Sequence, residues 1–362
     1  MTEQDAALLF TLLAEQKPGV LREIIARHGS FAGYFAADPG REPEQLSAPL
    51  RHYLRNRDQL LDRLHQASTR LREAGTHLLS SADSRYPGLL REIHRAPPLL
   101  YVKGDPQTLA MPQIAIVGSR HASRAGLKLA EDFAQALAAA GFAIVSGMAL
   151  GIDGAAHRGA LHTGTTVAVL GTGVEVVYPR QHRRLYDDIL AAGGAVVSEL
   201  PPASKPLRQY FPQRNRIISG LSLGVLIVEA ALQSGSLITA RLAMEQGREV
   251  FAVPGSIHNP MARGCHQLIR EGAVLTETLE DMVAQLGGML ALKAEESAAA
   301  DPSLPEDPVA RAVLTAMAFD PVAADTLIDR LSLPAAQLTA ALVSLEVQGF
   351  VEHLGGRYQR IR

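Results

Sequence analysis

The sequence predicts an α/β protein whose largest domain is a doubly wound, mostly parallel sheet. Residues 114–117 and 142–145 are unbroken apolar runs of strand length, and a helical stripe that includes Phe133 and Leu137 lies between them. Strands that are apolar on both faces are typical of parallel sheets covered by helices. Ligands of such sheets bind beyond the carboxyl ends of the strands, and a polar turn follows each of these two strands.

The composition indicates a globular protein with more than one domain. The chain has 362 residues, of which 47% are hydrophobic and 20% charged, and its net charge is -2. This length predicts two or three domains. With so little net charge, any site for a polyanion must come from the local placement of cations. The single cysteine, Cys265, the acidic N-terminus and the lack of a membrane-length apolar stretch predict a cytoplasmic protein without membrane insertion.

Residues 1–70 are expected to form a small helical domain. The apolar pattern predicts helices over 6–15, 19–27 and 50–71. Gly19 and Gly29 between short helices also suggest a helix-hairpin-helix or SAM-like module, but we favour a bundle with a solvated polar face. The next domain, residues 71–290, starts with a connector in which residues 98–104 have the pattern of an edge strand entered through prolines.

The rest of that domain alternates strands and helices. Further strands are predicted at 166–170, 195–198, 225–228 and 250–253, with helices at 180–192, 213–221 and 237–246. Gly193 and Gly247 stand where two of these helices should stop. The short connections imply the doubly wound arrangement.

Residues 291–308 are predicted to be a solvated linker, because they are rich in alanine, proline and acidic residues. Residues 309–362 then show helical stretches at 309–318, 323–331 and 335–348 and a hairpin, which is the pattern of a winged helix. The third helix contains no lysine or arginine, so it would gain little from contacts with phosphates. We therefore expect this domain to contact protein or to be accessory.

Several catalytic motifs are absent from the sequence. It has no P-loop, no nucleophile elbow, no H-E-x-x-H and no Cys/His cluster with metal spacing. The turn at Gly118 lacks the further glycines of a dinucleotide-binding fingerprint, and Val176 replaces the third glycine after Gly171-Thr172-Gly173. We therefore expect no cofactor, metal or catalytic residue, and we expect His157 and His162 to be structural.

Three turns at predicted strand ends are suited to binding anions. They are Gly118-Ser119-Arg120, Ser146-Gly147 and Ser234-Gly235-Ser236. Small residues let backbone amides approach a phosphate, and Arg120 adds a charged fork. Ser123 is expected to cap the following helix. Together the turns predict a phosphate-binding groove.

A basic run between residues 180 and 216 indicates what the groove binds. Residues 205–216 interleave Lys205, Arg208, Arg214 and Arg216 with Tyr210 and Phe211. Cations that follow a backbone, with aromatic rings for stacking, suit single-stranded nucleic acid. Two alternatives stay open: Phe211 packs in the core, and Arg216 pairs with Glu199 or Glu229. Lys205 and Arg208, in a proline-bounded loop, are the better candidates.

At these residues the chain resembles the DNA-processing protein A (DprA/Smf) family from about Tyr86 to Met282. The resemblance is carried by ordered motifs that include Ile116-Val117-Gly118-Ser119-Arg120, Gly151-Ile152-Asp153, Tyr178-Pro179, Phe211-Pro212-Gln213-Arg214-Asn215-Arg216, Ser234-Gly235-Ser236 and Val253-Pro254-Gly255. Leu150, His182 and His266 depart from residues that are frequent in the family.

The resemblance implies an extended Rossmann-like fold that binds single-stranded DNA without hydrolysing it. It also implies a homodimer that protects incoming strands and loads RecA recombinase during natural transformation. The family's DNA-contacting arginine falls on Arg120, and its basic residue ahead of the F-P-x-R-N-R motif falls on Lys205. The predicted DNA-binding set is Gly118, Ser119, Arg120, Ser123, Ser146, Gly147, Lys205, Arg208, Phe211, Arg214, Asn215, Ser234, Gly235 and Ser236.

The alternative function is a Rossmann-like nucleoside-monophosphate phosphoribohydrolase. That chemistry needs a P-G-G-x-G-T loop and a catalytic glutamate. Val253-Pro254-Gly255-Ser256 breaks the loop motif, which disfavours the enzyme.

Overall fold

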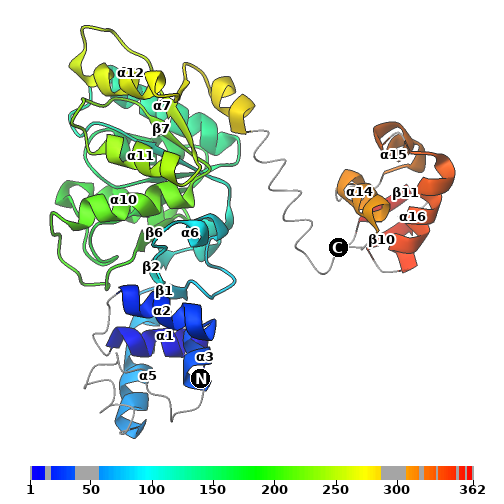
Figure 1. Ribbon diagram of the computed structural model, residues 1–362, viewed down its shortest axis with the longest axis horizontal. Coiled ribbons are helices and arrows are strands. Elements are labelled where there is room, and N and C mark those ends of the chain that lie inside the picture. Colours follow the sequence, from blue (N-terminus) through cyan, green and yellow to red (C-terminus); the bar gives the residue numbers. More distant parts are fainter. Residues whose placement is uncertain are drawn as a thin grey trace. The chain divides into compact units, whose positions relative to one another are not determined.

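The computed structural model forms two compact units, residues 1–286 and 287–362 (Figure 1). The structure describes residues 2–12, 18–36, 57–286, 307–317, 322–331, 333–347, 350–354 and 357–360. The predicted linker therefore lies, up to residue 306, outside the described residues. The predicted domain boundaries near residues 70 and 290 stay predictions.

The first unit contains a nine-stranded sheet in its described part, with the order β1-β2-β6-β5-β4-β3-β7-β8-β9. The strands are β1 (Thr76–Ser80), β2 (Leu99–Gly104), β3 (Gln113–Val117), β4 (Ala143–Ser146), β5 (Thr166–Val169), β6 (Ala195–Ser198), β7 (Gly224–Ile227), β8 (Glu249–Ala252) and β9 (Val274–Leu275). Along this spatial order, every neighbouring pair in the stretch β6-β5-β4-β3-β7-β8-β9 is parallel. In this sheet only the pairs β1–β2 and β2–β6 are antiparallel. This confirms the predicted α/β, mostly parallel sheet.

The prediction of an edge strand at 98–104 is wrong. β2 lies between β1 and β6, so its outer side is covered by a strand that the sequence pattern did not reveal. β9 was also missed, because two residues carry no periodicity.

The sheet is doubly wound around β3, whose two neighbours are β4 and β7. The helices of the parallel part are α7 (Arg124–Ala139), α8 (Ile152–Ala160), α9 (Arg183–Ala191), α10 (Tyr210–Leu221), α11 (Ser236–Glu245) and α12 (Arg263–Arg270). Shorter turns of helix are α6 (Gly88–Glu92), η1 (Pro106–Ala110), η2 (Arg180–His182) and η3 (Pro260–Ala262). α7 packs against α8, and α10 packs against α11 and α6.

The strand and helix sequences account for this packing. Alternate strand residues such as Val117, Val145 and Val169 join α10 residues Ile217 and Ile218 in one buried core. Helices end where predicted, since Gly193 and Gly247 adopt φ of 74° and 67°, the left-handed conformation that glycine tolerates. α10 starts three residues earlier than predicted, with Pro212 in its first turn, where proline removes no helical hydrogen bond.

The N-terminal helices pack at the β1 end of the sheet (Figure 1). They are α1 (Glu3–Leu12), α2 (Pro18–His28), α3 (Phe31–Ala36) and α5 (Arg57–Glu73), and the predicted residues 50–56 lie outside the described part. Phe10 and Phe31 share a buried core with Leu78 of β1 and Tyr101 of β2. The Glu3 carboxylate also accepts hydrogen bonds from the Phe31 and Ala32 amides and from Ser80 Oγ, which ties these helices to β1.

The second unit has the predicted winged-helix arrangement. Its elements are α14 (Pro308–Met317), α15 (Ala324–Leu331), α16 (Ala335–Val347), β10 (Val351–Leu354) and β11 (Arg357–Arg360). Val313, Leu327 and Leu342 from the three helices meet Phe350 in a separate core. α16 carries no lysine or arginine.

None of the helices in the described residues is long and apolar enough to cross a membrane.

His157 is buried in α8 as a neutral imidazole. Its Nδ1 lies 2.7 Å from Thr166 Oγ1, and the Thr166 hydroxyl donates to the Ile144 carbonyl. Because that hydroxyl has a single proton, Nδ1 must carry the hydrogen of the His157–Thr166 bond. Burial, followed by the nearby His182 and Arg214, lowers the pKa of His157 to about 3.

This pKa predicts acid sensitivity between pH 6.5 and about 3. In that window the unfolded His157 binds a proton and the folded one does not, so stability falls as pH falls, by about 1.4 kcal/mol per pH unit. We expect His157→Asn, which keeps a donor for Thr166, to make the free energy of unfolding depend less on pH across this range, as measured by urea unfolding. His162→Asn, at an exposed position on the same segment, is the control. An unchanged pH profile in His157→Asn would contradict the assignment.

Candidate nucleic-acid interface

A groove of about 670 Å³ lies at the point where the sheet reverses its strand order. Its walls are the turns after β3 and β7, the start of α8, and the first half of α10. Open α/β sheets bind ligands at this crevice, because two neighbouring strands send their connections to opposite faces there. The groove contains ten of the fourteen predicted residues: Gly118, Ser119, Arg120, Arg208, Phe211, Arg214, Asn215, Ser234, Gly235 and Ser236.

The turn after β3 is held tightly beneath the groove. A Cβ atom on Gly118 would lie 2.6 Å from Ile152 Cγ1, so a larger residue would push α8 away. The Ser119 amide donates to the Glu229 carbonyl at 2.6 Å, and Ser119 Oγ accepts from the His121 amide. Arg120 is exposed, and within the described part of the chain its guanidinium has no ion pair or hydrogen bond.

Ser123 is the N-cap of α7, as expected. Its Oγ accepts from the Gly126 amide at 3.0 Å and donates to Glu229 Oε1 at 2.7 Å. The Ser123 amide donates to the other carboxylate oxygen of Glu229. The serine therefore joins the start of α7 to the end of β7, and it does not line the groove.

The turn after β4 supports the groove from behind. Ser146 is fully buried, and its Oγ donates to the Ile116 carbonyl at 2.7 Å. The Gly147 amide donates to Asp153 Oδ2, and the Gly147 carbonyl accepts from Arg214 Nη1 at 2.8 Å. Gly147 thus positions Asp153 and Arg214, which do line the groove, whereas Ser146 joins β4 to β3.

Arg214 is the buried cation of the site. Its side chain comes from α10, is 5% exposed, and also donates to the Val169 carbonyl at the end of β5. Burial lowers the pKa of Arg214 to about 10, while the nearby Asp153 acts to raise it. Burial likewise raises the pKa of Asp153, against the opposing influence of Arg214 and of its hydrogen bonds from the Ala149 and Gly147 amides.

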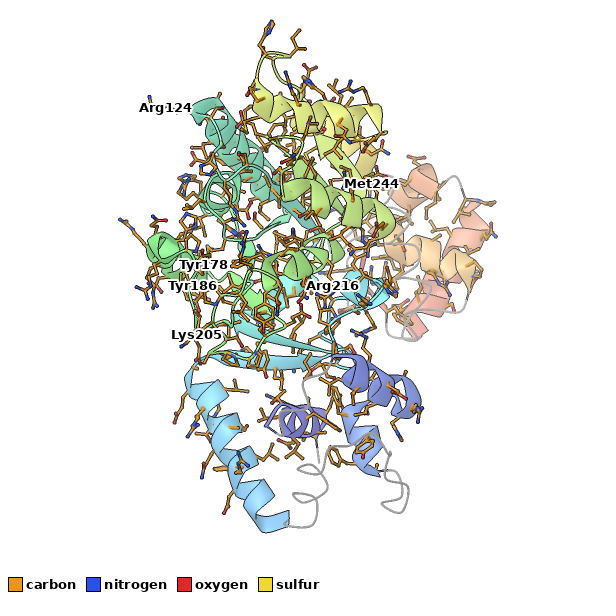
Figure 2. The ribbon with its side chains drawn as sticks, turned by 60° about the vertical axis from the view of Figure 1, so that its left-hand side comes forward. Arg124, Tyr178, Tyr186, Lys205, Arg216 and Met244 are labelled. Atoms are coloured by element: carbon orange, nitrogen blue, oxygen red, sulfur yellow. The ribbon has the colours of Figure 1, made fainter. Side chains whose placement is uncertain are left out.

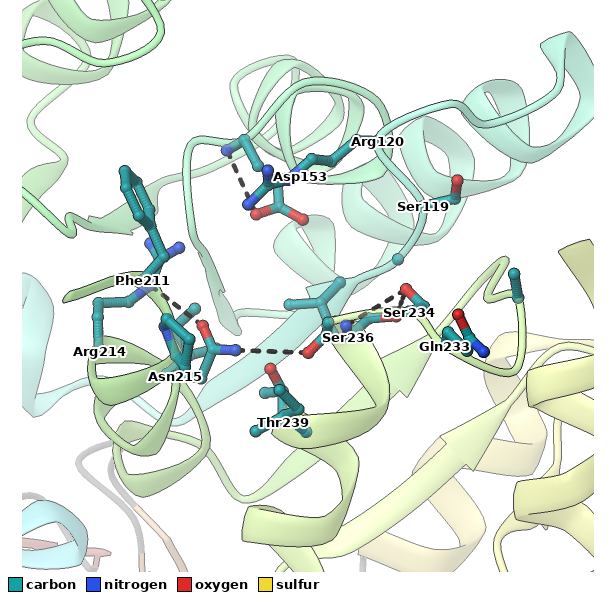
Figure 3. A pocket seen from close by; sticks show the side chains of 18 of the residues that line it. Ser119, Arg120, Asp153, Phe211, Arg214, Asn215, Gln233, Ser234, Ser236 and Thr239 are labelled. Atoms are coloured by element: carbon teal, nitrogen blue, oxygen red, sulfur yellow. Dashed lines mark hydrogen bonds between the residues drawn. The ribbon is translucent and has the colours of Figure 1, made fainter. Parts of the chain in front are cut away.

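The turn before α11 forms the opposite wall (Figure 3). Ser234 Oγ and Ser236 Oγ are 2.7 Å apart, and the Ser236 amide donates to Ser234 Oγ. The Asn215 side chain reaches across from α10 and donates to the Gly235 carbonyl. Figure 3 shows this bond joining the two walls, with Arg120 and Asp153 on the far side of the space.

An aromatic pair stands at the mouth of the groove. The Phe211 and Tyr178 ring centroids are 5.4 Å apart, and the Tyr178 side chain is 47% exposed. Phe211 also covers Gly171, where a Cβ atom would lie 2.8 Å from its ring. Phe211 is therefore half-buried against Gly171 and Tyr178 and lines the groove, but it belongs to neither buried core cluster of the first unit, and its role as a stacking platform stays a prediction.

The basic loop between β6 and α10 contributes Arg208 to the groove, whereas Lys205 is exposed in the same loop outside it (Figure 2). Arg216 pairs with Glu199 through two hydrogen bonds of 2.8 and 2.6 Å, as one of the alternatives expected. Among the groove residues, Arg120, Arg208 and Arg214 face one carboxylate, Asp153, which gives an excess of two positive charges with His121 neutral.

Sequence reasoning missed several lining residues: Asp153, Tyr178, Gln233 and Thr239. Asp153 and Tyr178 stand within motifs of the resemblance, so a signal existed for them. Gln233 and Thr239 flank the predicted serine turn without a pattern of their own. The described residues contain no cluster of metal-ligating side chains.

Comparison with known proteins identifies the family of this chain. The sequence matches the family model described as DNA recombination-mediator protein A over residues 77–287, and the one described as DprA winged helix domain over residues 297–357. Protein Smf of Escherichia coli (strain K12) is 42% identical over 296 residues, which are 81% of this chain and 79% of that protein. DNA processing protein DprA of Streptococcus pneumoniae is 48% identical over 207 residues, 57% of this chain and 73% of that protein.

Two solved structures are similar in fold to more than half of this chain. The X-ray structure of DNA processing protein A from Streptococcus pneumoniae superposes with a TM-score of 0.56 at 45% identity, over 62% of this chain and 80% of that one. DNA processing protein A from Helicobacter pylori, whose structure is described for its single-stranded DNA binding mode, has a TM-score of 0.53 at 28% identity, over 58% and 95%.

We expect Arg214→Met to destabilise the first unit by roughly 3 kcal/mol or more, because two buried carbonyls lose their donor and Asp153 loses its nearest cation. The measurement is urea unfolding of the full chain. Arg208→Met removes an exposed arginine from the same groove and should change the unfolding free energy by no more than about 0.5 kcal/mol. Equal effects of the two substitutions would show that Arg214 is not a structural cation.

Proposed function

The chain belongs to the DNA recombination-mediator protein A family, and from this premise we propose that its groove binds single-stranded DNA by the sugar-phosphate backbone. The observation that carries the proposal is Arg120. Its guanidinium stands exposed at the reversal point of the sheet, without a hydrogen bond or ion pair to any described residue, on a turn whose backbone is held by Glu229 and Ile152. An exposed arginine on a rigid turn at a strand end is suited to a phosphate.

The second support is the surroundings of Arg120. Arg208 adds a second exposed cation, and the hydroxyls of Ser234 and Ser236 add polar groups on the opposite wall. The Tyr178–Phe211 pair offers a ring surface on which an unpaired base can stack. A base inside a duplex has no free face, so this pairing of cations with rings favours a single strand. The Helicobacter pylori relative, described as binding single-stranded DNA, agrees with that preference.

We propose that the groove binds DNA without cleaving it. Among the described residues that line it, the single carboxylate is Asp153, which is 6% exposed and whose Oδ2 already accepts hydrogen bonds from two backbone amides. A general base must reach a proton on its substrate, and these two bonds leave only the second oxygen of a buried side chain for that task. The same reasoning disfavours the phosphoribohydrolase alternative, which an assay of nucleoside-monophosphate cleavage tests directly.

We expect Arg120→Glu to lose most of its affinity for oligo(dT) while remaining folded, because a cation at the backbone becomes an anion. For Arg120→Ala the slope of log K against log salt should fall by about 0.7, the share of one phosphate on a single strand. Fluorescence anisotropy at several salt concentrations measures both. Arg124→Glu is the matched control: it is an equal charge change four residues away, at the start of α7 (Figure 2), and Arg124 does not line the groove. Unaltered binding by Arg120→Glu would refute the proposal.

The finer role that we propose follows the family resemblance: a cytoplasmic homodimer that protects incoming strands and loads RecA recombinase during natural transformation. If loading requires the groove, the full chain should shorten the lag of RecA assembly on single strands, and Arg120→Glu should not. The Arg124→Glu protein is again the control. A lag that the unaltered chain leaves unchanged would remove RecA loading from the function while leaving DNA binding in place.

A further inference from the structure

A second groove of about 950 Å³ lies on the other side of α10. Its walls come from α2, the segment after α6, the start of β2, the loop after β6, and α11. The N-terminal helix α2 reaches this groove because the N-terminal helices share a buried core with β1 and β2. No part of the function proposed above uses this groove.

Three arginines gather in the second groove: Arg22 of α2, Arg95 of the segment after α6, and Arg216 of α10. Only Arg216 is neutralised within the described residues, by its two bonds to Glu199. Neither Arg22 nor Arg95 has an ion pair or a side-chain hydrogen bond in that part of the chain. Burial, then repulsion from Arg216 and Arg95, lowers the pKa of Arg22, so the influence of Glu199 is outweighed.

The acids of the groove leave this excess in place. Glu199 is engaged by Arg216, and Glu245 of α11 lines the groove without an ion pair to any described residue. Among the described lining residues, three arginines against two glutamates leave an excess of one arginine. Repulsion among like charges in a concave site is relieved when an anion enters, which is how arginine clusters recognise phosphates.

Arg95 is held in an uncommon conformation. Its φ is 61°, in the left-handed region that residues other than glycine rarely adopt. Its carbonyl accepts a hydrogen bond from Arg216 Nε at 3.2 Å, so the same arginine that pairs with Glu199 also fixes this turn. A backbone conformation of this kind persists only where the surrounding structure imposes it. The turn places the Arg95 side chain in the groove wall.

The two grooves share α10 as a partition. Phe211, Arg214 and Asn215 line the first groove, and Tyr210, Gln213 and Arg216 line the second, while Pro212 lines both. The first turn of α10 is thus the ridge between them. A helix with its side chains is ~10 Å across, which is the length of about three nucleotides at the ~3.4 Å spacing of a stacked strand.

We propose that the second groove binds phosphate groups of a nucleotide through Arg22 and Arg95. Two sources share this chemistry: a DNA strand that crosses the ridge from the first groove, or a free mononucleotide. The inference concerns a site separate from the Arg120 groove, and only the first source rests on the proposed function.

The test compares Arg22→Ala and Arg95→Asn, two substitutions on separate elements. Asparagine is chosen for position 95 because it tolerates positive φ. The matched control is Arg27→Ala, on the same helix as Arg22, where the side chain is 65% exposed and pairs with Glu23 outside the groove. Thermal unfolding of the full-length proteins confirms that each variant is folded.

The first arm measures affinity for an oligo(dT) series of about 4 to about 16 nucleotides. If a strand crosses the ridge, both variants should bind the longest oligonucleotide roughly tenfold more weakly, with a salt slope reduced by about 0.7, and should bind the shortest one normally. Arg120→Glu should instead lose every length. This difference separates failure of the second groove from failure of the first.

The second arm titrates dTMP into the Arg120→Glu protein, in which the first groove is disabled, by NMR or calorimetry. Binding that Arg22→Ala or Arg95→Asn abolishes would identify a free nucleotide as the ligand. If both variants match Arg27→Ala for every oligonucleotide and for dTMP, the second groove does not bind phosphate and the inference is overturned.

Discussion

The buried guanidinium of Arg214 is the interaction on which the rest of the site depends. It reaches from α10 to the carbonyls after β4 and at the end of β5, and it lies near the Asp153 carboxylate at the start of α8. One side chain therefore joins three neighbouring segments at the carboxyl edge of the sheet, which we call the rim. Gly147 has to be glycine here, because a Cβ atom would lie 2.6 Å from the Arg214 guanidinium nitrogens. A buried charge is costly unless it is hydrogen-bonded and compensated, and here two carbonyls accept hydrogen bonds from Arg214 while the Asp153 carboxylate provides a nearby opposite charge.

With the rim held in this way, the exposed cations are free to act on a ligand. Arg120 follows a turn that the Glu229 carbonyl and carboxylate fix from below, together with Ser123. Its own side chain makes no bond to the protein among the described residues. The site thus separates a structural cation, Arg214, which is buried and bonded to carbonyls, from the proposed binding cations Arg120 and Arg208, which are exposed and make no ion pair with a described residue. This separation explains why Arg208 and Arg214, only six positions apart, have different expected effects when substituted.

The sequence predicted the parallel strands and most helices correctly because their signals are local. Continuous apolar runs mark β3 to β8, and Gly193 and Gly247 mark helix ends through their positive φ. β1 was missed although Gly75, with a φ of 61°, separates Thr76–Ser80 from the preceding helix, and the pairing of β1 with β2 is set by tertiary packing. Within the site, small residues such as Ser146 and Gly147 looked like phosphate contacts. Which amides and hydroxyls are already engaged by other segments depends on long-range hydrogen bonds, and residue type does not encode these.

Because α10 lies between the two grooves, the N-terminal helices on one side of it have a structural role. Because residues on opposite faces of this helix line two grooves, the basic stretch 205–216 does not describe one surface, although it is continuous in sequence. Arg216 shows the difference: it is engaged by Glu199 on the side that faces α2, and it supports the turn of Arg95. The α2 wall exists only because Phe10, Phe31 and Tyr101 share a core, with Glu3 as a polar tie to β1. The N-terminal helices are therefore a part of the first unit that shapes a charged groove, which gives them a physical reason to be present beyond covering the end of the sheet.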